Sequence, residues 1–247
     1  FNLEDFYKLR HNVYLLKSPN LNVQTKIYKY TDLRTLFALS DGKFRISKRN
    51  SYTDCWELGE NDLRSIEHLR PVELPYTQQD ANLFSQRLAY RKKTSHLLTS
   101  CFTLESAELY SMWKCFASSE TGIRITTTIK DFIDSIEISG YTIYIGEMLY
   151  NKYDVGVNNP LFLFTKKDFY STEKEVRFYF VPNDGSISKE THVMLKIDAP
   201  VMINEVLLSP FIKESKMKGW MLKSLKSEFS LLSNKFNHSS IRVSNIL

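Results

Sequence analysis

A charged and aromatic segment late in the chain reads Glu173-Lys174-Glu175-Val176-Arg177-Phe178-Tyr179-Phe180-Val181. Its aromatic and β-branched residues favour a β-strand, in which successive side chains point to opposite faces. Alternation then gives one mainly apolar face, made of Lys174, Val176, Phe178 and Phe180, and one polar face, made of Glu173, Glu175, Arg177 and Tyr179. The polar face is either the floor of a polar cleft or a solvated edge with an ion ladder of little energetic value. For a generic antiparallel sheet, the solvated face is the better interpretation.

The segments around this strand predict an α+β fold with a mixed, mainly antiparallel sheet and flanking helices. Near the start, a strand over 26–30, a short helix over 33–39 capped by Asp32, and a strand over 43–47 form a β-α-β unit. At 247 residues the chain is long enough to bury its own core, and we expect a single domain over 1–247.

Three further segments have patterns of their own. Apolar residues at helical spacing predict an N-terminal helix over 3–16. The polar segment 48–75 has no sustained period and is interpreted as an insertion or lid. An apolar stripe followed by alternating residues predicts a C-terminal helix and strand over 213–246.

Missing motifs exclude several kinds of chemistry. The eight glycines are never closer than six positions apart, so neither a GxGxxG loop nor a Walker phosphate loop can form. The five histidines are scattered, which excludes an HExxH zinc helix. The three cysteines include no CxxC pair, so no zinc ribbon or disulfide framework is expected, and Cys101 and Cys115 are interpreted as inert buried thiols. We therefore expect no metal site.

Charge and hydropathy set limits on partners and compartment. A net charge of +5 permits a nucleic-acid partner without requiring one. A basic cluster around Tyr90 is either a strand-binding patch or a solvated helix end, and it comprises Arg87, Arg91, Lys92 and Lys93. No apolar run approaches the roughly 18 residues that a membrane helix needs, so no membrane partner is expected. The cysteine usage favours the reducing cytoplasm.

The β-α-β unit carries a second group of candidate site residues. Alternation places Tyr28 and Tyr30 on one face of the first strand and Lys29 on the other, while Arg45 and Ser47 end the second strand. Paired tyrosines can stack on a planar ligand, although tyrosine is also a common filler of strands. Trp113 lies at helical spacing with other apolar residues, which is typical of core packing.

Six short motifs occur in one order along the chain, and together they resemble a widespread bacterial and phage family of unknown function. The family pattern is YKY, GKLxFS, FNDPFE, CFS, MWxxYAxxHxG and EKEWR. The matching segments are 27–30, 42–47, 52–57, 100–103, 112–113 with 122–123, and 173–177. The chain departs from the pattern at Thr53 and Cys55, and at Glu120-Thr121, where the family has its His. The resemblance therefore does not carry over a role that needs that His or the family's Asn, which Thr53 replaces.

The same order of elements more distantly resembles ADP-ribosyltransferases that modify DNA and related RNA phosphotransferases. The resemblance implies an ADP-ribosyltransferase-like core in which NAD, as substrate, lies between the first strands and a late strand that carries a glutamate. It implies Glu175 as the catalytic carboxylate, with Glu173 as its competitor and Tyr28 beside the nicotinamide. The cofactor-binding residues implied are Tyr28, Lys29, Tyr30, Arg45, Ser47, Trp113 and Arg177.

These residue types suit that chemistry. Cleavage of the nicotinamide bond passes through an oxocarbenium-like ribose, which a nearby carboxylate stabilises. Glu175 is preferred over Glu173 because Arg177 would be its neighbour on the same face and would keep it ionised.

Two functional hypotheses follow from this resemblance. In the first, the chain is a toxin or antiviral effector that transfers ADP-ribose from NAD to a nucleic acid or a protein, and a neutralising antitoxin or defence partner is then expected. In the second, the same cleft is a non-catalytic sensor that binds a nucleotide or a partner protein.

Overall fold

The computed structural model describes residues 3–48, 94, 97–117, 120–150, 160–166, 168–186, 190–212 and 215–239. Within these residues, eleven strands form one sheet, and the short strands β8 (Leu149–Tyr150) and β9 (Thr165–Lys166) pair separately. Neighbouring strands of the large sheet are antiparallel except for two parallel pairs, β2 with β7 and β12 with β13. The predicted α+β class with a mixed, mainly antiparallel sheet is therefore confirmed.

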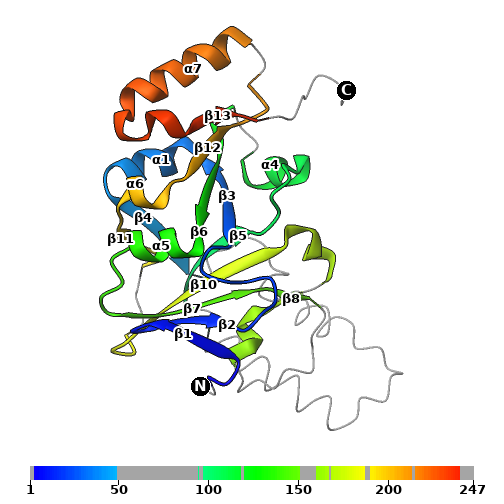
Figure 1. Cartoon of the computed structure of the whole chain (residues 1–247), viewed down its shortest axis with the longest axis vertical. Helices are drawn as coiled ribbons and strands as arrows, with labels where there is room; N and C mark the ends of the chain where they lie inside the picture. The colour runs from blue at the N-terminus through cyan, green and yellow to red at the C-terminus, as the bar shows by residue number, and fades with distance from the viewer. Residues whose placement is uncertain are drawn as a thin grey trace.

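The order of strands brings distant segments together. The main path is β1 (Phe6–Arg10), β2 (Val13–Leu16), β7 (Tyr141–Glu147), β10 (Glu175–Pro182), β5 (Leu98–Thr103), β3 (Lys26–Asp32), β6 (Gly122–Thr128), β12 (Glu205–Leu208) and β13 (Phe236–His238). Off this path, β4 (Lys43–Lys48) pairs with β5, and β11 (His192–Lys196) pairs with β4. Strand β10, which carries Glu175 and Arg177, thus lies between β7 and β5, near the middle of the sheet (Figure 1).

Helices cover the sheet at several points. They are α1 (Leu33–Ser40), α4 (Tyr110–Phe116), α5 (Ile129–Ser135), α6 (Ala199–Met202) and α7 (Ser215–Glu228), with the 3-10 helices η2 (Pro160–Phe164), η3 (Asp168–Glu173) and η4 (Ser230–Lys235). The Asp32 side chain caps α1 by accepting a hydrogen bond of 3.3 Å from the Thr35 backbone N–H, as its position in the sequence predicted. Helix α7 lies at one end of the long axis and the β1–β2 hairpin at the other (Figure 1).

Both faces of β10 are buried. On its apolar face, Phe178 packs in T-shaped contacts against Phe132 of α5, at 4.8 Å between ring centroids, and Phe102 of β5, at 5.2 Å. On the other face, Glu175 is 4% exposed, Arg177 1% and Tyr179 0%. The solvated interpretation of this face is therefore wrong.

The cover over the polar face of β10 comes from η2. The Tyr179 hydroxyl donates a hydrogen bond of 2.8 Å to the Leu163 carbonyl, and the Tyr179 ring meets Phe164 edge to face at 5.3 Å. Gly146 of β7 lies opposite Arg177 in the register, and a Cβ atom there would come within 2.7 Å of the Phe164 ring. The glycine thus leaves the space that Phe164 fills above the sheet.

The N-terminal helix predicted over 3–16 is wrong. The segment forms an antiparallel hairpin, β1 with β2, whose turn includes Asn12 at a φ of 59°. Strand β2 then pairs in parallel with β7, which buries Val13 and Leu15. The spacing of apolar residues fitted a helix, but pairing with β7 satisfies the backbone of β2 and buries its apolar side chains.

The predicted C-terminal helix is present as α7. Farther along the chain, β13 pairs in parallel with β12. The strand predicted toward residue 246 and the lid predicted over 48–75 lie outside the described residues, apart from Lys48. None of the described helices is both long and apolar enough to cross a membrane.

Candidate functional site

The candidate site lies at a gap in the sheet. One edge of β5 is shared by two strands, because Thr99 pairs with Ser47 of β4 and Thr103 pairs with Tyr28 of β3. Between these pairs, no strand in the described part of the chain pairs with residues 100–102 on that edge. The gap opens into a cavity of about 350 Å³, at the lower end of the roughly 300–1,000 Å³ range of small-molecule sites.

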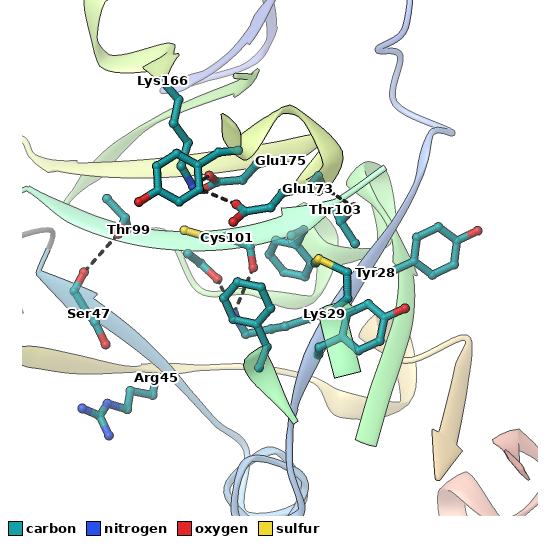
Figure 2. Close-up of a pocket in the computed structure, with 16 residues that line it drawn as sticks. Tyr28, Lys29, Arg45, Ser47, Thr99, Cys101, Thr103, Lys166, Glu173 and Glu175 are labelled. Carbon is teal, nitrogen blue, oxygen red and sulfur yellow. Dashed lines mark hydrogen bonds and ion pairs between the residues drawn. The ribbon is translucent and has the colours of Figure 1, made fainter. Parts of the chain in front are cut away.

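The register places the predicted residues on one face around this gap. Tyr28, Thr103 and Glu175 form one row across β3, β5 and β10. Ser47, Thr99 and Tyr179 form a second row. The cavity is lined by seven of the residues predicted from the sequence, namely Tyr28, Lys29, Tyr30, Arg45, Ser47, Glu173 and Glu175 (Figure 2).

On the β10 side, Glu175 is held by two cations. Arg177 binds it in a bidentate pair, with Nε 2.6 Å from Oε1 and Nη2 2.8 Å from Oε2. Lys166 of β9 places Nζ 2.9 Å from Oε2. Burial alone would raise the pKa of the Glu175 carboxyl, but Arg177 and Lys166 outweigh burial and hold that pKa well below its usual range. Glu175 is therefore a permanent anion at neutral pH.

Glu173 also contacts Lys166, but it belongs to η3 and not to β10. It ends η3 rather than continuing the strand, and Lys174, at a φ of 41°, turns the chain into β10. The Nζ atom of Lys166 nevertheless lies 2.8 Å from Glu173 Oε2, so one lysine bridges both carboxylates. The Glu173 side chain is 19% exposed, against 5% for Glu175. The two acids, which the sequence could not separate, thus differ in their access to the cavity.

On the opposite side, Tyr28 and Tyr30 form an aromatic wall with Arg124 of β6. The Arg124 guanidinium carbon lies 4.8 Å from the centroid of the Tyr28 ring and 6.0 Å from that of Tyr30. Two polar atoms of this wall, Tyr30 Oη and Arg124 Nε, are buried without a hydrogen-bond partner in the described residues. Burial raises the pKa values of Tyr28 and Tyr30, and the Arg124 charge opposes the rise in both.

The Lys29 side chain extends into the gap from the core side of the sheet. It starts on the core side of β3 and reaches the open edge of β5, where Nζ donates to the Cys101 carbonyl at 3.1 Å and to Ser100 Oγ at 3.4 Å. The Cys101 carbonyl, which accepts no hydrogen bond from a neighbouring strand among the described residues, thus accepts one from the Lys29 side chain. In Figure 2, Lys29 lies on one side of β5, and Lys166, Glu173 and Glu175 lie on the other.

Two of the predicted cofactor residues do not line the cavity. Trp113 is fully buried beneath Tyr30, with ring centroids 5.0 Å apart, and its Nε1–H donates to Glu108. Arg177 is also buried, and it donates hydrogen bonds to Glu175 and to the Tyr179 hydroxyl. Both residues support the side chains that line the cavity instead of facing a ligand.

Among the residues that sequence reasoning missed are Lys166, Tyr170 and Cys101, which line the cavity, and Arg124, which lies beside its tyrosines. Lys166 ends the apolar segment 161–166, whose pattern does not distinguish a helix from a strand, and Tyr170 lies beyond it. The Lys166 ammonium lies 4.2 Å from the centroid of the Tyr170 ring. Cys101 is half-buried and lines the cavity, while Cys115 is exposed, so the expectation of two buried thiols is wrong. Arg124 was hidden within a β-strand pattern, where only its charge signalled a special role.

Several residues that the sequence analysis singled out lie outside the described residues. The basic cluster around Tyr90 lies outside the described residues, as do Thr53 and Cys55. Among the described residues there is no group of three or more His, Cys, Asp and Glu side chains that could hold a metal ion.

Comparison of the sequence with protein-family models and with curated proteins finds no match. The family resemblances drawn from the motifs therefore stay predictions.

Proposed function

We propose that this cavity binds NAD and that the protein transfers the ADP-ribosyl group to a nucleic acid or a protein, as a toxin or defence effector. The observation that carries the proposal is the row Tyr28–Thr103–Glu175, which brings the predicted aromatic and acidic residues to one cavity. Their positions in the sequence are 147 residues apart (175 − 28), so only the fold brings them together.

The acidic side of the cavity supplies the charge that this reaction needs. Loss of nicotinamide leaves positive charge on the ribose, and a fixed anion stabilises that charge best where water is excluded. Glu175 is buried and ionised, and Glu173 is the more exposed of the two acids. In this proposal Glu175 supplies the fixed charge, while Glu173 contacts the ribose and orients its 2′-hydroxyl.

The opposite side suits the rest of the dinucleotide. Tyr28 and Tyr30 offer aromatic surface to a planar base, and Arg45 of β4 is an exposed cation at the cavity for the pyrophosphate. No glycine loop is needed for this mode of binding, in agreement with the spacing of glycines in the sequence.

The test is release of nicotinamide from NAD by the wild-type protein and two variants. We expect turnover by the wild type and a loss of about 100-fold or more in Glu173→Gln and Glu175→Gln, the magnitude typical of removing one electrostatic contact to a transition state. Glu105→Gln is the matched control, because Glu105 pairs with Lys174 at 2.6 Å and does not line the cavity. Glu173→Gln is the cleaner variant, since Glu175→Gln also leaves Arg177 buried without its carboxylate.

A non-catalytic nucleotide sensor is the second candidate, and one observation favours it. Both oxygens of Glu175 already accept hydrogen bonds from Arg177 and Lys166, as in a structural ion cluster. A rise in melting temperature with NAD, without any release of nicotinamide, would support the sensor and contradict the transferase.

A further inference from the structure

Two lysines line the same cavity in opposite surroundings. Lys166 lies within 3 Å of two carboxylates, at 2.8 Å from Glu173 and 2.9 Å from Glu175. Lys29 has no carboxylate within 4 Å among the described residues, and both of its hydrogen-bond acceptors are neutral. Lys166 is therefore held by two carboxylate partners, while Lys29 has no carboxylate partner among the described residues.

The surroundings of Lys29 further disfavour its charged form. Its side chain passes between Phe102 and Phe44, with Nζ 5.1 Å and 6.0 Å from the two ring centroids. Ring faces attract a cation weakly, but they do not replace the water that an exposed ammonium would keep. The titratable groups that act on Lys29 across the gap are the Cys101 thiol and the Glu175 carboxylate, and both raise its pKa. Burial outweighs them and lowers the pKa of Lys29 below its usual value.

We infer that Lys29 is an imine-forming amine, poised to capture an aldehyde, such as the open-chain form of a pentose, that enters the cavity. Lys29 is half-buried, lines the cavity and has no carboxylate partner among the described residues, and these are the surroundings that favour a nucleophilic lysine. The amine selects an aldehyde, and the hydroxyl side chains of Thr99, Ser100 and Thr103, which line the cavity, suit a polyhydroxylated chain. The inference does not depend on NAD.

The reaction balances without any co-reactant. The lone pair of neutral Lys29 Nζ forms a bond to the aldehyde carbon, and the π electrons of the C=O bond move to oxygen, which takes a proton from nitrogen. The resulting carbinolamine then loses its hydroxyl group with the second nitrogen proton as water, leaving a C=N bond. Hydrolysis reverses both steps and restores the free amine.

The experiment traps this imine on the full chain. The protein is incubated at pH 7 with ribose 5-phosphate, and separately with propanal as a small uncharged aldehyde. Cyanoborohydride reduces any imine to a stable secondary amine, and peptide mass spectrometry then locates the label. We expect Lys29 to be labelled at least several-fold more than the exposed lysines Lys43 and Lys196, with label appearing at lower pH than on those residues.

Lys166 is the control within the same cavity. Its two carboxylates should keep it unlabelled under conditions that label Lys29, and Lys29→Arg should remove the cavity label. Equal labelling of Lys29 and Lys166, or label confined to the exposed lysines, would overturn the inference and leave Lys29 as a cap for the open edge of β5. Because no NAD is present, this result stands apart from the outcome of the nicotinamide assay.

Discussion

Each of two walls of the cavity contacts a buried arginine, and the surroundings of the two arginines differ. The acidic wall is formed by Glu173 and Glu175, and the aromatic wall by Tyr28 and Tyr30. Arg177, 1% exposed, holds Glu175 in a bidentate pair behind the acidic wall. Arg124, 5% exposed, has no carboxylate within 4 Å among the described residues and donates to the Ser106 carbonyl at 3.1 Å. The acidic wall is thus fixed by matched charges, whereas the aromatic wall packs against a cation whose Nε has no hydrogen-bond partner among the described residues.

The difference indicates what each wall can do for a ligand. A compensated ion cluster resists rearrangement, because removing one partner leaves a buried charge. In the aromatic wall, Tyr30 Oη and Arg124 Nε have no hydrogen-bond partner among the described residues, and the Arg124 cation lies beside the Tyr28 ring. We therefore expect the β10 side to set the charge of the site and the β3 side to adapt to what binds.

The largest effect should follow from Arg177→Met. This change leaves Glu175 buried without its bidentate partner and should lower the free energy of unfolding by about 3–5 kcal/mol. Urea unfolding measures it. The double variant Glu175→Gln/Arg177→Met should recover part of the loss, because no carboxylate is then left unpaired by arginine. A loss below about 1 kcal/mol would show that the pair is not buried as described.

Acid should produce a smaller effect on the same wall. The pKa of Glu175 is lowered in the folded protein, so the unfolded chain binds a proton more readily. The stability that this group contributes is complete above its unfolded pKa of about 4.3, and it is lost as pH falls from there toward the folded pKa. Unfolding free energies measured from pH 6 to pH 2.5 should fall less steeply in Glu175→Gln than in the wild type. Parallel curves would contradict the assignment.

Arg124→Met should change stability least, by about 1 kcal/mol or less. The variant loses a hydrogen bond to Ser106 and the contact with the Tyr28 ring, but it also removes a buried cation that has no carboxylate within 4 Å in the described part of the chain. The comparison sharpens if this variant weakens nucleotide binding, measured by calorimetry, while its unfolding free energy stays near that of the wild type. A loss as large as that of Arg177→Met would mean that the two arginines play the same role.

Local patterns in the sequence predicted much of the sheet. The β-α-β unit, the Asp32 cap and strand β10 follow from alternation and capping, which depend on neighbouring residues. The hairpin at the N-terminus was mistaken for a helix because its identity depends on pairing with β7, more than 120 positions away (141 − 16 = 125). Burial of the polar face of β10 could not be predicted either, since it depends on η2 and Phe164.

Local alternation also predicted part of the site, whereas the residues that depend on contacts between distant segments were missed. Tyr28, Glu175 and Ser47 lie on strand faces that alternation fixes, so their side of the sheet could be inferred once their strands were known. Lys29 could not be placed, because it enters the cavity from the core side through a gap between strands that only the topology creates. Lys166 comes from a two-residue strand outside the main sheet, which leaves no periodic signal.

A crystal structure of the protein with a non-cleavable NAD analogue tests the central claim most directly. The account predicts the analogue within the gap along β5, its base against Tyr28 or Tyr30 and its nicotinamide ribose within hydrogen-bond distance of Glu173. An analogue bound away from this gap, or a ribose on the far side of the sheet from both glutamates, would contradict the account.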